Sequence, residues 1–330
     1  MARKTPRRTT KARTPESKPE ERKPSIRRTA IVFTVAVLAI IGISIVVGLY
    51  FTIWQDLWSP AIRVNDETIN MDYIIRRMKY LERTNDVHAT MTTITEEELI
   101  RQAAQRYGIE VNPGEIDALL REMARGENET ISESEFEAWY RNILNETKLS
   151  DAEYRDWLAV ILLADRINDI LVESVPTAAE QVHLYIIVLP SPEDAEEALA
   201  RIEEGEDFSE LARELSIDEE TAEQGGDAGW WPWGGGLHLN VQYYAFTLEI
   251  GEVSDITILD EDAGTSAICM ITEKQSVREI EEDKLETIKS GVFEQWLYNE
   301  KETADIQWFS LDGGAFDTYT MQWISLQVAK

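Results

Sequence analysis

Beyond residue 60, apolar residues first recur at the three- and four-residue spacing of an amphipathic helix. Two pairs have the spacing of a capping box, in which a hydroxyl and a carboxylate satisfy the first backbone amides of a helix: Thr95 with Glu98, and Ser150 with Glu153. We therefore expect one helix to start at Thr95 and another at Ser150. The pattern predicts that residues 62–175 are almost entirely helical.

The periodicity changes after Pro176. Residues 180–189 (EQVHLYIIVL) are dense in β-branched and aromatic side chains, which favours a buried strand. Two short amphipathic helices, a glycine-rich loop and a further helical stretch follow, and then two segments with strand character that end near Lys274. This order predicts a compact α+β unit. A helical pattern resumes at Ile280, and the last 26 residues match no regular pattern.

Residues 30–54 form a different kind of segment, with 25 consecutive uncharged and mostly apolar residues. At 1.5 Å per residue, such a helix can cross a hydrocarbon layer of about 30 Å. A cleaved signal peptide is the alternative, but its apolar region is only about 7–15 residues long and precedes a small-residue cleavage site. The longer run, which ends in Tyr50 and Trp54, predicts an uncleaved transmembrane anchor.

The charge of the chain is divided sharply at this segment. Residues 1–28 carry a net charge of +8, whereas the remaining 302 residues carry −38. The basic block is rich in Pro, Thr and Ser and is expected to be disordered. Because basic residues stay on the cytoplasmic side, it predicts a cytoplasmic N-terminus with all later residues outside. The acidic exterior argues against nucleic acid as a partner.

Few residues in the chain suggest catalytic chemistry. Its single cysteine, Cys269, lies in an apolar run and cannot form an intrachain disulfide, so it is expected to be a small buried side chain. No metal-ligand cluster, nucleophile motif or phosphate-binding loop is evident, so no metal or cofactor is predicted. The distinctive stretch is AEQGGDAGWWPWGGG at residues 222–236, which combines six glycines with three tryptophans.

Residues 180–275 resemble the parvulin family of peptidyl-prolyl isomerases. The resemblance rests on the ordered blocks G-x-D-F-x-E-L-A, S-x-D, G-G-D-x-G-W and A-F-x-L-x-x-G-E-V-S. The helical portion, with VNDETINMDYIIRRMKYL, resembles the N-terminal chaperone region of foldases of the SurA and PrsA type. The resemblance implies an α+β fold in which a four-stranded antiparallel sheet with surrounding helices is inserted into a mostly helical chaperone domain.

Together, the patterns and the resemblance predict six segments. These are a disordered basic cytoplasmic tail (1–29), a transmembrane helix (30–54), a helical SurA-like chaperone domain (55–178), a parvulin domain (179–276), a helix returning to the chaperone domain (277–304) and a C-terminal tail (305–330).

The resemblance also implies a proline-binding slot, which parvulins line with two histidines, an acidic residue or cysteine, and apolar side chains. Here the two histidine positions fall on Ile186 and Ala267, which leaves open whether the chain is an efficient isomerase. Asp218 matches the acidic position and is the one candidate catalytic residue. The other candidate substrate-binding residues are Leu237, Val241, Phe246 and Trp233.

Two histidines lie near these positions. His183 precedes Ile186 by three residues, so on a regular strand its side chain points to the opposite face of the sheet. His238 lies in the loop beside the slot. Neither is assigned to the site.

The glycine-rich stretch has an expected structural role beside the slot. Gly225 and Gly226 are expected at positive φ, and Asp227 is expected to hold the loop through hydrogen bonds to backbone amides. Trp230 and Trp231 should alternate across a strand.

The sequence as a whole predicts a membrane-anchored extracytoplasmic foldase of the parvulin class. Its partners would be unfolded or proline-containing polypeptides and, through residues 30–54, the lipid bilayer. It would assist secreted or membrane proteins, with weak isomerase activity and mainly a chaperone role. The alternative is a non-catalytic scaffold that uses the parvulin unit to bind one dedicated membrane partner.

Overall fold

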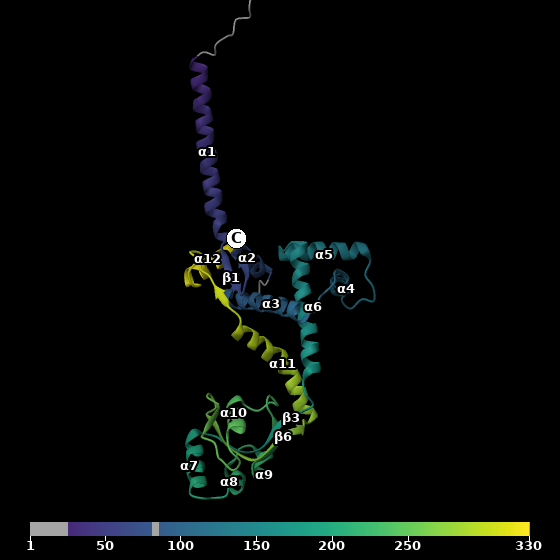
Figure 1. Ribbon diagram of the computed structural model, residues 1–330, viewed down its shortest axis with the longest axis vertical. Helices are drawn as coiled ribbons and strands as arrows, with labels where there is room; N and C mark the ends of the chain where they lie inside the picture. Colours follow the sequence, from purple (N-terminus) through teal and green to yellow (C-terminus); the bar gives the residue numbers. More distant parts are fainter. Residues whose placement is uncertain (1–25, 81–85, 330) are drawn as a thin grey trace, which may run out of the picture. The chain divides into compact units, whose positions relative to one another are not determined.

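The computed structural model describes residues 26–80 and 86–329, which form two compact units, one ending at Trp58 and the other starting at Ser59 (Figure 1). Most of the predicted basic tail therefore lies outside the described residues. The first unit contains α1 (Ile26–Trp58), whose apolar side chains between Phe33 and Val47 are exposed. None of the helices in the described part of the chain meets the length and apolarity required to cross a membrane.

The second unit begins with a short hairpin, β1 (Pro60–Val64) and β2 (Glu67–Asn70), and continues as helices. The helices are α2 (Met71–Tyr80), α3 (Val87–Tyr107), α4 (Pro113–Arg125), α5 (Glu133–Thr147) and α6 (Asp151–Ser174). The capping box of Ser150 with Glu153 is present at the start of α6, as predicted.

The predicted start of a helix at Thr95 is wrong. α3 begins eight residues earlier, where Asp86 accepts a hydrogen bond from the amide of Ala89. Thr95 lies buried inside the helix, and its hydroxyl donates to the carbonyl of Met91 at 2.8 Å. A threonine four residues after a backbone carbonyl can bond it within a continuous helix, so the spacing to Glu98 does not mark a start.

The remainder of the second unit contains a four-stranded antiparallel sheet of order β4-β3-β6-β5, which confirms the predicted α+β class. The strands are β3 (Ala178–Leu189), β4 (Asp227–Pro232), β5 (Thr257–Asp260) and β6 (Thr265–Glu279). Between β3 and β4 lie α7 (Pro192–Glu203), α8 (Phe208–Leu215) and α9 (Glu219–Glu223), and α10 (Leu239–Thr247) follows β4.

Two apolar clusters cover the two faces of this sheet. Leu184 and Cys269 face α10 together with Val241 and Ala245. On the other face, Ile187 packs with residues of α7 and α8. Alternate residues of β3 thus serve alternate clusters, as the period of a strand requires.

The chain then returns to the helical part. α11 (Glu282–Thr303) packs on α3 and α6, where Phe293 and Trp296 join an apolar cluster around Ala103 and Ile167. The last residues, which match no regular pattern in the sequence, form β7 (Ile306–Trp308) and α12 (Thr318–Val328). β7 pairs with β1, so the first and last strands of the second unit are neighbours.

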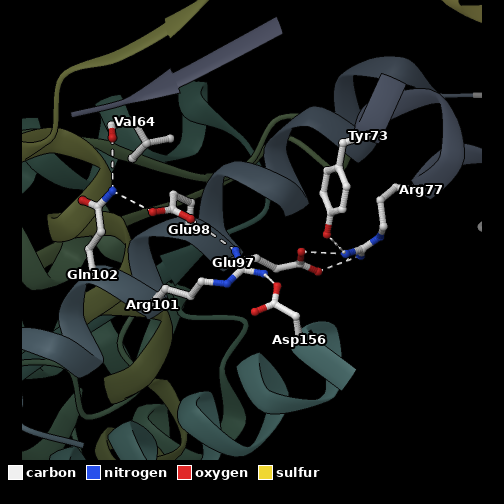
Figure 2. Close-up of polar contacts among 8 residues, drawn as sticks. All are labelled: Val64, Tyr73, Arg77, Glu97, Glu98, Arg101, Gln102 and Asp156. Carbon is white, nitrogen blue, oxygen red and sulfur yellow. Dashed lines mark hydrogen bonds and ion pairs between the residues drawn. The ribbon is translucent and has the colours of Figure 1, made fainter. Parts of the chain in front are cut away.

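A buried ion pair lies between α2 and α3 (Figure 2). The guanidinium of Arg77 donates two hydrogen bonds to the carboxylate of Glu97, at 2.7 and 2.8 Å, and a third to the hydroxyl of Tyr73 at 3.2 Å. Burial alone lowers the pKa of Arg77, but the hydrogen bonds and charge of Glu97 outweigh burial and raise it. The guanidinium also lies 5.6 Å from the ring centre of Trp157. A charged group is therefore part of the helical core.

Candidate functional site

A cavity of about 650 Å³ runs along the free edge of β4. Five successive residues, from Asp227 to Trp231, line it. Successive strand residues point to opposite faces, so a cavity lined by all of them lies along the edge of the strand rather than on one face. Residues of α9 and of the first turn of α11 also line it.

The glycine-rich stretch shapes this edge. Gly225 and Gly226 have φ values of 71° and 84°, as predicted, and turn the chain from α9 into β4. A side chain at Gly226 would lie 2.8 Å from the carbonyl oxygen of Ile186, so only glycine fits there. Ala228 is an extra residue in the pairing of β4 with β3, a bulge that opens the ladder beside Leu184.

The predicted loop contacts are present. Asp227 Oδ1 accepts a hydrogen bond from the amide of Gly229 at 2.9 Å. Trp231 turns toward the apolar cluster that contains Leu184, and its indole donates to the carbonyl of Ala228 at 2.7 Å. Trp230 turns the other way and stacks on His183, with ring centres 5.1 Å apart.

Three of the predicted site residues line the cavity: Ile186, Asp218 and Leu237. Ile186 and Leu237 are half-buried and form part of its apolar floor with Leu184. Asp218 precedes α9, and its Oδ2 accepts a hydrogen bond from the hydroxyl of Thr221 at 2.8 Å.

The other four predicted residues lie elsewhere. Val241 and Ala267 are buried, with 2% and 1% of their surface exposed, in the cluster against which Ile186 and Leu237 pack. Phe246 is half-buried at the margin of that cluster. Trp233 is exposed, and its ring meets that of Phe246 edge-on at 5.3 Å between centres.

His183 also lines the cavity, although the sequence reasoning placed it away from the slot. Its ring Nε2 lies 3.1 Å from Asp227 Oδ1, and its Nδ1 lies 2.9 Å from the hydroxyl of Thr272. On a regular strand His183 and Ile186 point to opposite faces, so a site confined to one face of the sheet would exclude His183. Because the cavity follows the strand edge, residues from both faces reach it.

Several other lining residues were not among the predicted site residues. Trp230, Thr221 and Lys284 reach the cavity from β4, α9 and α11, which are separated by up to about sixty positions. The hydroxyl of Tyr185 donates a hydrogen bond to Asp227, which lines the cavity. Burial raises the pKa of this hydroxyl, and the charge and hydrogen bond of Asp227 raise it further.

A second cavity, of about 550 Å³, lies between α10 and β5. His238 lines it, and its side chain caps α10 by accepting a hydrogen bond from the amide of Asn240. Tyr243 and Tyr244 form one wall. None of the predicted catalytic or substrate-binding residues lines this second cavity.

Comparison with known proteins finds a family match over part of the chain that lines the β4 cavity. Residues 191–272 match the model of the rotamase family, described as a PPIC-type PPIASE domain. The chain is 36% identical over 129 residues to the foldase protein PrsA of Oceanobacillus iheyensis. The matched stretch covers 38% of this chain and 41% of that protein. With PrsA of Bacillus subtilis it shares 34% identity over 111 residues, covering 34% of this chain and 36% of the relative.

The chain thus spans less than half the length of these curated relatives. A crystal structure of the peptidylprolyl isomerase PrsA from Bacillus cereus matches 83% of this chain and 92% of its own, at 15% identity and a TM-score of 0.38. The resemblance recognised in the sequence is confirmed. Residues 191–272 are a parvulin-type domain, and the chain is similar to foldases of the SurA and PrsA kind.

Proposed function

We propose, from the parvulin-type domain, that this chain is an extracytoplasmic foldase that binds proline-containing segments of unfolded polypeptides in the cavity along β4. The observation that carries the proposal is the combination within that one cavity of an apolar floor, formed by Leu184, Ile186 and Leu237, with polar groups at its rim. A pocket of this size and composition suits a proline ring and its neighbours.

Weak isomerase activity is part of the proposal. Rotation about a peptide bond faces a barrier of about 18–20 kcal/mol because resonance holds the amide planar. A site lowers this barrier only by binding the twisted amide better than the planar one. Twisting removes resonance and with it part of the negative charge on the carbonyl oxygen. The carboxylate of Asp218, facing that oxygen, would therefore disfavour the planar amide.

The family's histidines would add further polar contacts at this point, and Ile186 and Ala267 cannot supply them. Losing about 3 kcal/mol of discrimination would slow the reaction on the order of a hundredfold. Apolar binding of the proline ring does not depend on an imidazole, and each buried CH₂ group contributes about 0.8 kcal/mol. The balance favours binding over catalysis.

Membrane anchoring through residues 30–54 completes the proposal. Its support is the run of 25 uncharged residues, together with the change from a basic sequence before this run to an acidic sequence after it. The N-terminus would then be cytoplasmic, with residues 55–330 outside. Protease added to cells whose outer layers have been removed should digest the second unit. Its full protection would contradict this topology.

The segments on either side of the parvulin-type domain would have separate roles. Residues 55–178 would form a SurA-like chaperone domain, to which residues 277–304 return after the parvulin domain at 179–276. Support for this division comes from the packing of α11 on α3 and α6.

A non-catalytic scaffold for one membrane partner is the second candidate, and it is favoured by the burial of Ala267. At that position the core leaves no room for an imidazole, so the catalytic arrangement of the family cannot be restored by one change there. Suppression of aggregation of several unrelated denatured proteins supports the foldase. A single stoichiometric partner without such suppression supports the scaffold.

The decisive test is a protease-coupled isomerisation assay with the full chain in detergent, together with peptide affinities. We expect measurable binding of Xaa-Pro peptides and a turnover about a hundredfold below that of a histidine-bearing parvulin. Ile186→His, at a half-buried cavity position, should raise turnover more than affinity. Glu261→Gln, in the cavity between α10 and β5, is the matched control and should change neither. Absence of any peptide binding would refute the proposed site.

A further inference from the structure

The rim of the β4 cavity carries an unusual charge. Five carboxylates line it: Asp218, Glu220, Asp227, Glu281 and Asp283. Carboxylic acids are ionised at neutral pH, so the rim is strongly negative. The cavity between α10 and β5, by contrast, has one carboxylate, that of Glu261. The cavity along β4 therefore carries more negative charge than the cavity between α10 and β5.

Most of this charge is not neutralised by the chain itself. Asp227 contacts His183, and Glu281 forms an ion pair with Lys284. Asp218 receives only a hydroxyl hydrogen bond, from Thr221. Within residues 26–80 and 86–329, no lysine or arginine forms an ion pair with Asp218, Glu220 or Asp283. Like charges placed close together repel one another, so a cation entering this rim is favoured.

Lys284 shows how such a cation fits. This side chain, from the first turn of α11, is 8% exposed and lines one end of the cavity. Its ammonium lies 4.5 Å from the ring centre of Trp231 and is paired with the carboxylate of Glu281. The long alkyl stem of a lysine packs on apolar surface while its charge meets a ring face and a carboxylate. The cavity thus already holds one alkylammonium group.

We infer that the β4 cavity selects segments in which a lysine or arginine adjoins the proline. This inference rests on the proposed function and deepens it by naming the substrate class. An extended segment would place the proline against the floor of Ile186 and Leu237 and the neighbouring cation at the rim near Asp218, Glu220 and Asp283. The net charge of −38 on the chain beyond residue 28 would also draw basic segments toward the protein from a distance.

The test compares three peptides, Ala-Lys-Pro-Phe, Ala-Leu-Pro-Phe and Ala-Glu-Pro-Phe, for affinity to the full chain in detergent by calorimetry. At low salt we expect the lysine peptide to bind roughly tenfold more tightly than the glutamate peptide, with the leucine peptide between them. At 1 M salt the Debye length falls to about 3 Å, and the preference should shrink to about twofold or less.

A variant isolates the rim. The double change Glu220→Gln and Asp283→Asn keeps size and hydrogen bonding but removes two exposed negative charges. It should lower the affinity for the lysine peptide by roughly three- to fivefold and leave that for the leucine peptide unchanged. Glu261→Gln, in the other cavity, is the matched control and should leave both affinities unchanged.

The outcomes separate the two claims. Equal affinities for the three peptides, or a lysine preference that survives the double change, would overturn the selectivity and leave the proposed peptide site intact. Failure of all three peptides to bind would overturn the proposed function and the selectivity with it. A preference that is salt-sensitive and lost in the double variant supports both.

Discussion

The guanidinium of Arg77 is fully buried between α2 and α3, whereas the two clusters on the faces of the four-stranded sheet are built from apolar side chains such as Leu184, Ile187 and Ile271. The first kind of interior depends on matched partners, because a buried charge without its counter-ion is costly. The second depends on volume and shape. The two parts of the unit should therefore fail in different ways when residues are changed.

The largest expected effect comes from separating the buried pair. Glu97→Gln leaves the Arg77 charge without its counter-ion and should lower the free energy of unfolding by about 3–5 kcal/mol. The double change Arg77→Met with Glu97→Leu should recover most of that loss, since neither charge is then buried. Urea unfolding measures both.

An exposed pair provides the control for this prediction. Lys289→Gln removes a pair with Glu286 on the surface of α11 and should change stability by less than about 0.5 kcal/mol. If Glu97→Gln were equally harmless, the buried pair would not be the element that holds α2 to α3.

In the sheet region, the largest effect should come from a backbone position. Gly226→Ala places a methyl group 2.8 Å from a backbone oxygen at φ 84° and should cost about 2–4 kcal/mol. Gly229→Ala is the matched control, because its φ is similar, 75°, but nothing lies within 4 Å of the added carbon. It should cost only about 1–2 kcal/mol. Equal costs for the two variants would mean that the contact with Ile186 is unimportant.

The thiol of Cys269 reports on the apolar character of the sheet interior. Burial raises its pKa to about 11, although the hydroxyl of Ser254 acts in the opposite direction. A folded pKa above the unfolded value means that the thiol's contribution to stability is fully present below about pH 8.5 and is lost as the pH rises through about 11. Relative to Cys269→Ala, the native chain should lose about 3 kcal/mol more over this range. Parallel pH profiles of the two proteins would contradict the raised pKa.

The smallest expected effect on stability is that of Trp233→Ala. This residue is 56% exposed and meets only the edge of Phe246, so its loss should cost less than about 1 kcal/mol. The sequence predicts it as a substrate-binding residue although it does not line the cavity along β4, so the peptide affinity of this variant tests that prediction. An affinity unchanged by Trp233→Ala would remove this residue from the site while leaving the cavity along β4 in place.

Local patterns in the sequence predicted local structure well. The capping box at Ser150, the positive φ at Gly225 and Gly226 and the strand at residues 180–189 all depend on neighbours within a few positions. The pattern at Thr95 failed because a buried threonine can bond a carbonyl four residues earlier inside a helix, which mimics the composition of a start.

Features that join distant parts of the chain left no local trace. Arg77 and Glu97 are twenty positions apart, and either one alone would be interpreted as a surface charge. Lys284 lines the cavity from α11, which comes after the last strand of the four-stranded sheet. The residues of β7 have no strand pattern in the sequence, and their extended structure is accounted for by their pairing with β1. His183 lines the cavity beside Trp230, its pairing partner on β4. These placements follow from tertiary packing and not from the periodicity of any one segment.

The pairing of β1 with β7 sets an order of events during synthesis. The amide of Asn65 donates to the carbonyl of Asp305 at 2.8 Å, so the first strand of the unit is completed by residues made about 240 positions later. Contacts this distant along the chain form slowly. The four-stranded sheet and the helices that pack on it, by contrast, lie within residues 178–279, so they are synthesised as one continuous stretch. The four-stranded sheet can thus be finished while the helical segment before it still lacks its last strand. A chain that ends before residue 306 contains β4 and all residues that line the cavity. It lacks β7, the strand that pairs with β1 in the helical part of the unit.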